Sequence, residues 1–147
     1  MKNILIIILA MTMSLSVLSQ NPKSYIEKYK SVSIELMQKT HIPSSVILGI
    51  SMLESGSGTS KLSKYGHNYF GIKGGKHYKK YNSDTASFND FGKLITKKKF
   101  YSKISNSKDY NVWLLNMQRM GYSESPQWRS RIIYIIKKYN LTQYDII

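Results

Sequence analysis

Glu54 is the residue whose type and position point most directly to chemistry in this chain of 147 residues. It ends a nearly continuous apolar run that begins at Val46, and it precedes the flexible sequence Ser55-Gly56-Ser57-Gly58. If the run is helical, its apolar surroundings and the negative end of its dipole both raise the pKa of Glu54. A carboxyl group that stays protonated near neutral pH can protonate a departing glycosidic oxygen. The position fits equally well a surface glutamate that caps a helix or pairs with a lysine.

Other chemistries lack the residues or the spacing that they need. The histidines, His41, His67 and His77, are too far apart for the short spacing of a shared metal site, and no His-Glu-x-x-His occurs. The absence of cysteine excludes disulfides, thiolate nucleophiles and zinc–thiolate sites. Neither a Gly-x-Ser-x-Gly elbow nor a phosphate-binding glycine loop is present. We therefore expect no metal and no cofactor.

The charge of the chain indicates a polyanionic partner. There are 22 Lys+Arg against 8 Asp+Glu, which gives a formal net charge of +14. Basic runs alternate with aromatic residues, an arrangement that suits a carboxylate-bearing glycan or single-stranded nucleic acid. These residues are Tyr78-Lys79-Lys80-Tyr81 and Lys97-Lys98-Lys99-Phe100-Tyr101.

Residues 1–19 have the layout of a secretory signal peptide. Lys2 precedes an apolar stretch that ends in small residues, so we expect cleavage between Ser19 and Gln20. A membrane anchor is the alternative, but a span needs about 20 predominantly apolar residues and this stretch contains Ser and Thr midway. We expect an exported domain, residues 20–147, located in the periplasm, outside the cell or at the cell wall, without a stable membrane anchor. Export favours a glycan over nucleic acid as the partner.

Helical periodicity covers most of the exported part. The pattern predicts a helix over residues 22–39, a buried helix that starts at Pro43 and continues through 44–54, and helices at 89–103, 110–120 and 126–139. Between the helices predicted at 44–54 and 89–103, the pattern of residues 69–73 and 76–81 predicts two strands joined by a Gly74-Gly75 turn. The expected fold is α+β and mainly helical, with a small β-hairpin lobe.

Four ordered motifs, with later matches, resemble the glucosaminidase domain of glycoside hydrolase family 73, peptidoglycan hydrolases of the flagellar-rod and autolysin type. The motifs are Ile42-Pro43-Ser44-Ser45-Val46-Ile47-Leu48, Leu53-Glu54-Ser55-Gly56, Gly58-Thr59-Ser60-Lys61-Leu62 and Asn68-Tyr69-Phe70-Gly71-Ile72-Lys73. The matches continue at Trp113, Gly121-Tyr122, Pro126 and Tyr139-Asn140-Leu141. The resemblance implies a lysozyme-like fold that cleaves the β-1,4 bond between N-acetylglucosamine and N-acetylmuramic acid.

The resemblance also implies roles for individual residues. Glu54 is the expected general acid, and Tyr122 is expected to position the substrate or the attacking water. Asn68 and Phe70 are expected to shape the cleft, although packing under the hairpin explains Phe70 equally well. Tyr81 is a further candidate for substrate binding, because it follows the basic run of the hairpin. We expect a monomer that binds peptidoglycan strands.

The chain departs from the family pattern where a second carboxylate is expected. The residues before Ser87-Phe88 are Thr85 and Ala86, so Asp84 is the nearest acidic substitute. Phe91 replaces a histidine after Asp90, and we interpret Asp90 as a helix cap. The acidic residue expected three positions after Tyr122 is Ser125, with Glu124 one position early. Either an N-acetyl group of the substrate assists the reaction, or activity has been lost.

Three other functions remain open at this point. A muramidase or lytic transglycosylase on a related fold also places a glutamate at a helix end. A non-catalytic cationic wall-binding module is favoured by the missing hairpin acid. A nucleic-acid binder is the weakest alternative, since residues 1–19 predict export.

Overall fold

The computed structural model describes residues 21–146, so the predicted signal peptide and the predicted cleavage point lie outside the described residues. The described chain is built from seven α-helices, one two-stranded sheet and a terminal 3-10 helix. In chain order they are α1 (Pro22–Thr40), α2 (Ser44–Ser55), α3 (Lys61–Gly66), β1 (Lys73–Gly74), β2 (His77–Tyr78), α4 (Asp84–Thr96), α5 (Tyr101–Ile104), α6 (Tyr110–Arg119), α7 (Trp128–Lys138) and η1 (Leu141–Tyr144). No helix between residues 21 and 146 is long and apolar enough to cross a bilayer.

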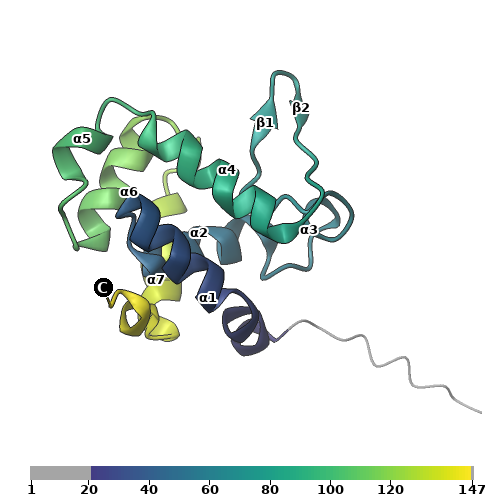
Figure 1. Cartoon of the computed structure of the whole chain (residues 1–147), viewed down its shortest axis with the longest axis horizontal. Helices are drawn as coiled ribbons and strands as arrows, with labels where there is room; N and C mark the ends of the chain where they lie inside the picture. The colour runs from purple at the N-terminus through teal and green to yellow at the C-terminus, as the bar shows by residue number, and fades with distance from the viewer. Residues whose placement is uncertain (1–20, 147) are drawn as a thin grey trace, which may run out of the picture.

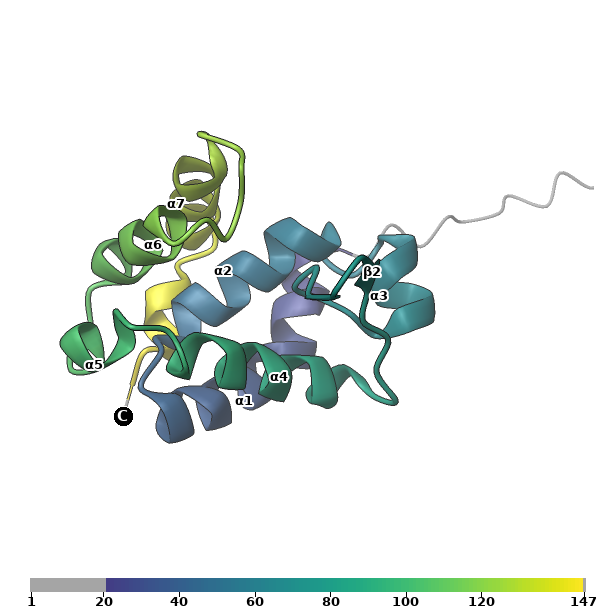
Figure 2. The same cartoon turned by 90° about the horizontal axis from the view of Figure 1, so that it is seen from above.

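Helix α2 is the centre of the fold. It packs against α1, α6, α7 and η1, and Figure 2 shows it lying between the α1–α4 pair and the α6–α7 pair. Residues Ser44 to Met52 are all buried, because the run is apolar nearly all round and has no polar face to turn to water. The hairpin of β1 and β2 projects from one end of the helical body (Figure 1). The α+β, mainly helical fold with a small β-hairpin lobe expected from the sequence is confirmed.

The start of α2 is capped from the far end of the chain. Pro43 is the N-cap residue rather than the first helical residue, and it provides no side-chain cap. Asp145 provides it instead: its carboxylate accepts hydrogen bonds from the backbone N–H of Ser45 at 2.7 Å and from the Ser45 hydroxyl at 2.6 Å. A carboxylate at this end also interacts favourably with the helix dipole. The last residues therefore hold the helix that carries Glu54.

The β-lobe is smaller than the sequence predicts. Only Lys73–Gly74 and His77–Tyr78 pair, so the turn is formed by residues 75–76 and not by Gly74-Gly75. The buried side chain of Asn68 is the reason: its amide nitrogen donates to the carbonyl oxygens of Ile72 and Lys79, each at 2.9 Å. Its oxygen accepts from the Ile72 N–H at 3.1 Å. These bonds fold residues 68–72 into a turn and leave few residues to pair.

Helix α4 begins five residues before the predicted start at residue 89. The side chain of Ser83 accepts a hydrogen bond from the N–H of Ala86, which is the geometry of an N-cap. The interpretation of Asp90 as a helix cap is therefore wrong, because Asp90 lies inside α4. Its carboxylate binds the Lys79 ammonium at 2.8 Å and the Tyr81 hydroxyl at 2.7 Å, and so ties the hairpin to α4.

Candidate active site

Glu54 is the penultimate residue of α2 and lies where that helix ends at a cleft. The helix stops because Gly56 adopts the left-handed conformation, with φ 57°, and its N–H bonds back to carbonyls of the last turn. Glu54 is partly buried. The mostly apolar helix α2 thus places a single carboxyl group, that of Glu54, on the wall of the cleft.

Two residues of α7 and the hairpin backbone surround this carboxyl group. The indole N–H of Trp128 donates a hydrogen bond to Glu54 Oε1 at 2.8 Å. Burial raises the pKa of Glu54, against the opposing effects of the Trp128 hydrogen bond and the positive charge of Arg131. On the hairpin side, Gly71 has φ +65°, and a Cβ there would lie 3.7 Å from Glu54 Oε2. The expectation that burial raises this pKa agrees with the structure.

The cleft has a volume of about 590 Å³, which is in the range of small-molecule sites. Its walls come from the end of α2, the hairpin, the end of α4 and the loop between α6 and α7. The lining residues are Glu54, Phe70, Gly71, Ile72, Lys73, Tyr78, Leu94, Lys98, Met120, Gly121, Tyr122, Ser123, Glu124 and Ser125. Segments that are far apart in the sequence therefore build one site.

Tyr122 lies on the cleft wall beside Glu54. Its hydroxyl donates to the Phe70 carbonyl oxygen at 3.0 Å, and its ring centroid is 5.1 Å from that of Trp128. Burial and the nearby negative charge of Glu54 raise the pKa of Tyr122 well above its ordinary value. The hydroxyl therefore stays protonated and ties the α6–α7 loop to the base of the hairpin.

Asn68 and Phe70 support the cleft mainly from behind. Asn68 is 1% exposed and is not among the lining residues, since its side chain holds the hairpin base. Phe70 is 2% exposed, and its ring stacks on Phe91 with centroids 4.2 Å apart. Phe91, at the position where the family resemblance led us to expect histidine, thus belongs to the aromatic core under the cleft.

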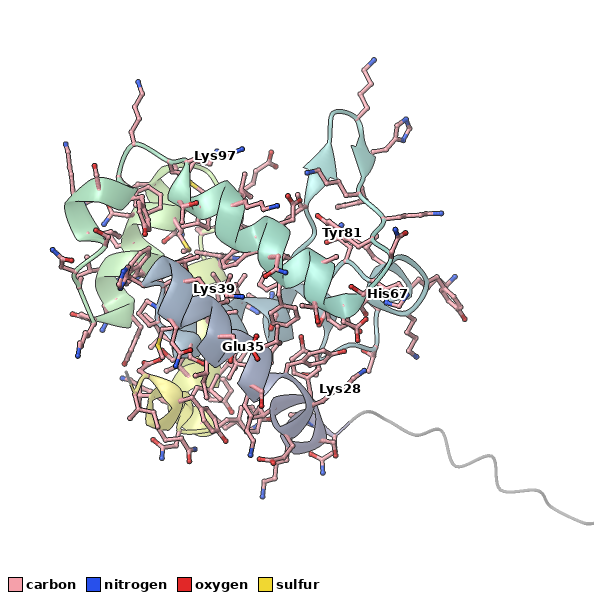
Figure 3. All side chains as sticks on the ribbon, viewed as in Figure 1. Lys28, Glu35, Lys39, His67, Tyr81 and Lys97 are labelled. Atoms are coloured by element: carbon pink, nitrogen blue, oxygen red, sulfur yellow. The ribbon has the colours of Figure 1, made fainter. Side chains whose placement is uncertain are left out.

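Asp84 and Tyr81 are not among the residues that line the cleft. The Asp84 carboxylate accepts from the Tyr29 hydroxyl at 2.6 Å, and it contacts His67 Nδ1 at 2.6 Å and the Lys28 ammonium at 3.2 Å. Figure 3 shows Tyr81 and His67 near the base of the hairpin lobe, and Lys28 lower down on α1. The structure therefore places Asp84 in a cluster that joins α1, α3 and α4.

Glu124 is the other carboxylate of the cleft, although no catalytic role was predicted for it. Within residues 21–146, Glu54 and Glu124 are the acidic residues that line the cleft. Glu124 is exposed on the α6–α7 loop, two positions after Tyr122. The sequence feature that could have indicated it is its position, one residue before the place where the family pattern has an acidic residue.

The cleft also carries positive charge, from the hairpin and from the residues that follow α4. Lys73 and Lys98 line it, and the Lys73 ammonium lies 5.1 Å from the centroid of the exposed Tyr78 ring. These cations suit a substrate with carboxylates. No group of three His, Cys, Asp or Glu within residues 21–146 could hold a metal ion.

The chain matches one protein family and is similar to curated bacterial proteins. The family described as mannosyl-glycoprotein endo-beta-N-acetylglucosaminidase matches residues 30–141. The exo-glucosaminidase LytG of Bacillus subtilis is 27% identical over 137 residues, which cover 75% of this chain and 49% of LytG. The autolysin of Enterococcus faecalis is 26% identical, over 86% of this chain and 21% of the autolysin. The chain thus spans half or less of the length of these curated relatives.

Solved structures share the fold. The catalytic domain of the autolysin Auto from Listeria monocytogenes superposes with a TM-score of 0.76 at 26% identity, over 90% of this chain and 92% of that domain. The glycoside hydrolase domain of FlgJ from Salmonella typhimurium gives a TM-score of 0.69 at 17% identity, over 84% of this chain and 91% of that domain. The second likeness concerns the fold alone.

Proposed function

Because the chain belongs to the glucosaminidase family, glycoside hydrolase family 73, we propose that it is an exported peptidoglycan hydrolase. The proposed reaction is endo-cleavage of the β-1,4 bond between N-acetylglucosamine and N-acetylmuramic acid. The observation that carries this proposal is Glu54, a partly buried carboxyl group with a raised pKa on the wall of a cleft. Residues 1–19 would direct export.

In the proposed mechanism the protonated Glu54 donates its proton to the glycosidic oxygen as the bond to the glucosamine carbon breaks. The Trp128 N–H fixes the orientation of the carboxyl group at the end of α2. After transfer, the same N–H and the positive charge of Arg131 stabilise the carboxylate that forms. The Tyr122 hydroxyl keeps the α6–α7 loop against the hairpin and so maintains the cleft.

We propose Glu124 as the carboxylate that activates the attacking water. It is the acidic residue that shares the cleft with Glu54, whereas Asp84 and Asp90 are bound to basic and tyrosine side chains outside it. A base that accepts a proton from water produces inversion of the anomeric carbon. The alternative is assistance by the substrate N-acetyl group, for which no second carboxylate is needed.

The test is release of new reducing ends from purified peptidoglycan. Glu54→Gln should lower kcat/KM by about 100-fold or more, in line with the contribution of general acid catalysis. Glu27→Gln is the matched control, because Glu27 is an exposed residue of α1 that pairs with Lys30. Full activity of Glu54→Gln would remove Glu54 from the mechanism.

The role of Glu124 needs a second comparison. Glu124→Gln should also lose activity, and azide should restore turnover by replacing the activated water. If Glu124→Gln is fully active while de-N-acetylated glycan is not cleaved, substrate assistance replaces the Glu124 proposal.

Product analysis separates this function from its alternatives. Mass spectrometry should find N-acetylglucosamine at the new reducing end. Muramic acid there would indicate a muramidase, and an anhydro sugar a lytic transglycosylase. Release of single sugars would indicate exo-action, which is the activity in the name of LytG. Wall binding without any cleavage by the wild type would indicate a cationic binding module.

A further inference from the structure

A second hollow of about 380 Å³ lies beside the end of α2, and the proposed function does not use it. It is lined by Leu53, Ser130, Arg131, Tyr134 and Ile135, and it shares no lining residue with the cleft. The α7 residues at 131, 134 and 135 have the i, i+3, i+4 spacing of one helix face. We call this hollow the α2–α7 groove.

The α2–α7 groove combines an exposed aromatic ring with positive charge. Tyr134 is 61% exposed, and the Lys138 ammonium lies 5.4 Å from its ring centroid. Arg131 is exposed, and no ion pair within residues 21–146 involves it. Leu53 and Ile135 are half-buried and give the groove apolar sides.

This chemistry suits a short peptide with free carboxylates. A guanidinium binds a carboxylate through two parallel hydrogen bonds, and a nearby ammonium adds attraction. The Lys138 ammonium lies over the Tyr134 ring, so the aromatic surface of the groove carries positive charge beside it. The apolar sides accommodate small aliphatic side chains. Charge therefore favours an acidic peptide over further sugar units.

The position of the α2–α7 groove identifies the source of that peptide. Leu53 precedes Glu54 directly, and Arg131 acts electrostatically on Glu54, so the groove and the reacting bond are close together. In the proposed reaction Glu54 protonates the oxygen on C4 of the leaving muramic acid. The lactyl group that carries the peptide is attached to C3 of the same sugar, one carbon away. The branch must therefore leave the cleft near Glu54.

We propose that the α2–α7 groove binds the acidic peptide branch of the leaving muramic acid, with Arg131 on a peptide carboxylate and Tyr134 against the peptide chain. The inference rests on the proposed function, since that function defines the leaving sugar. It makes the chain selective for wall strands that still carry their peptides. Glycan stripped of peptides remains a substrate, but a poorer one.

The activity test compares two substrates that differ only in the peptide. These are purified wall glycan with its stem peptides and the same glycan after an amidase has removed them. Tyr134→Ser should lower kcat/KM about fivefold to tenfold on the first substrate and leave the second unchanged, which corresponds to the loss of one or two modest contacts. Tyr65→Ser is the matched control, because Tyr65 is 79% exposed on α3. Equal effects of Tyr134→Ser on both substrates, or no effect, would overturn the proposal.

A binding test keeps this inference separate from the proposed function. The wild-type domain is titrated, with NMR detection of backbone amides, with a synthetic stem tripeptide that has free carboxylates and with its fully amidated form. Amides of residues 130–135 should shift with the acidic peptide and much less with the amidated one. An equal response to both peptides, no response, or a response only to a peptide-free chito-oligosaccharide contradicts the proposal. If the wild type cleaves neither glycan, the proposed function fails, and this titration still decides whether the groove binds the acidic peptide.

Discussion

Replacing Trp128 by phenylalanine tests whether the α7 indole sets the proton affinity of Glu54. The substitution removes the N–H that donates to Glu54 Oε1 at 2.8 Å, and it retains an aromatic ring beside Tyr122. A hydrogen bond to a charged acceptor contributes about 1.5–3 kcal/mol, and one to the neutral acid about 0.5–1.5 kcal/mol. The carboxylate therefore loses about 1–1.5 kcal/mol more than the acid does, which corresponds to about one pKa unit.

The direction of the change follows from the role of the proton. Glu54 must be protonated to act, so activity falls as the pH rises through its pKa. Because the Trp128 N–H stabilises the carboxylate, its removal raises the pKa of Glu54. The alkaline limb of kcat/KM should therefore move to higher pH by about one unit in Trp128→Phe, even if the maximal rate falls. Arg131 and Tyr122, the other polar neighbours of Glu54, stay in place.

The assay is the pH dependence of reducing-end release from purified wall. Trp113→Phe is the matched control, because Trp113 lies on α6 and its indole N–H donates to the Ser107 carbonyl oxygen at 2.8 Å, not to a cleft residue. Its alkaline limb should coincide with that of the wild type. A Trp128→Phe limb that stays in place, or that moves to lower pH, refutes the reasoning.

Three further variants test the framework of the site. Asp145→Ala removes two hydrogen bonds from the start of α2 and should lower the free energy of unfolding by about 2 kcal/mol. Thermal unfolding should show this as a melting temperature lower by about 5–8 °C, and Asp145→Asn should lower it less. Partial burial raises the pKa of Asp84, but hydrogen bonds from Tyr29 and His67 outweigh this and lower it to about 2. Stability should thus fall as the pH drops from about 4 to 2, and acid-denaturation curves of Asp84→Asn should be flatter there. Tyr122→Phe should lower kcat/KM about threefold to tenfold, far less than loss of the general acid, since one neutral hydrogen bond is removed.

Helices were predictable where one face is apolar and the ends carry local signals. The first helix was placed to within one residue, because its periodicity and Pro22 are local features. The start of α4 was missed, although Ser83 is a recognisable N-cap, because the helix was predicted only from residue 89. The hairpin was predicted, but its short length was not, since that length depends on the buried amide of Asn68 and its carbonyl partners.

The candidate site was also predictable only where it depends on local sequence. An apolar helix that ends in glutamate and glycine predicts a partly buried carboxyl group, because every face of such a helix must be covered. The partners that tune it are Trp128 and Arg131, more than 70 residues later. Nothing in the local pattern around Glu54 indicates which aromatic or basic residue will face it.

The sequence by itself determined the family, the helical body, the buried central helix and the carboxyl group at its end. These features depend on composition, periodicity and residues that are adjacent in the chain. Only the tertiary structure decided that Asp84 lies in an ion-pair cluster, that Glu124 shares the cleft with Glu54, and that Asp145 caps α2. The physical reason is that hydrogen bonds and ion pairs are made between atoms in contact, and helix packing, which sets those contacts, joins residues far apart in the sequence.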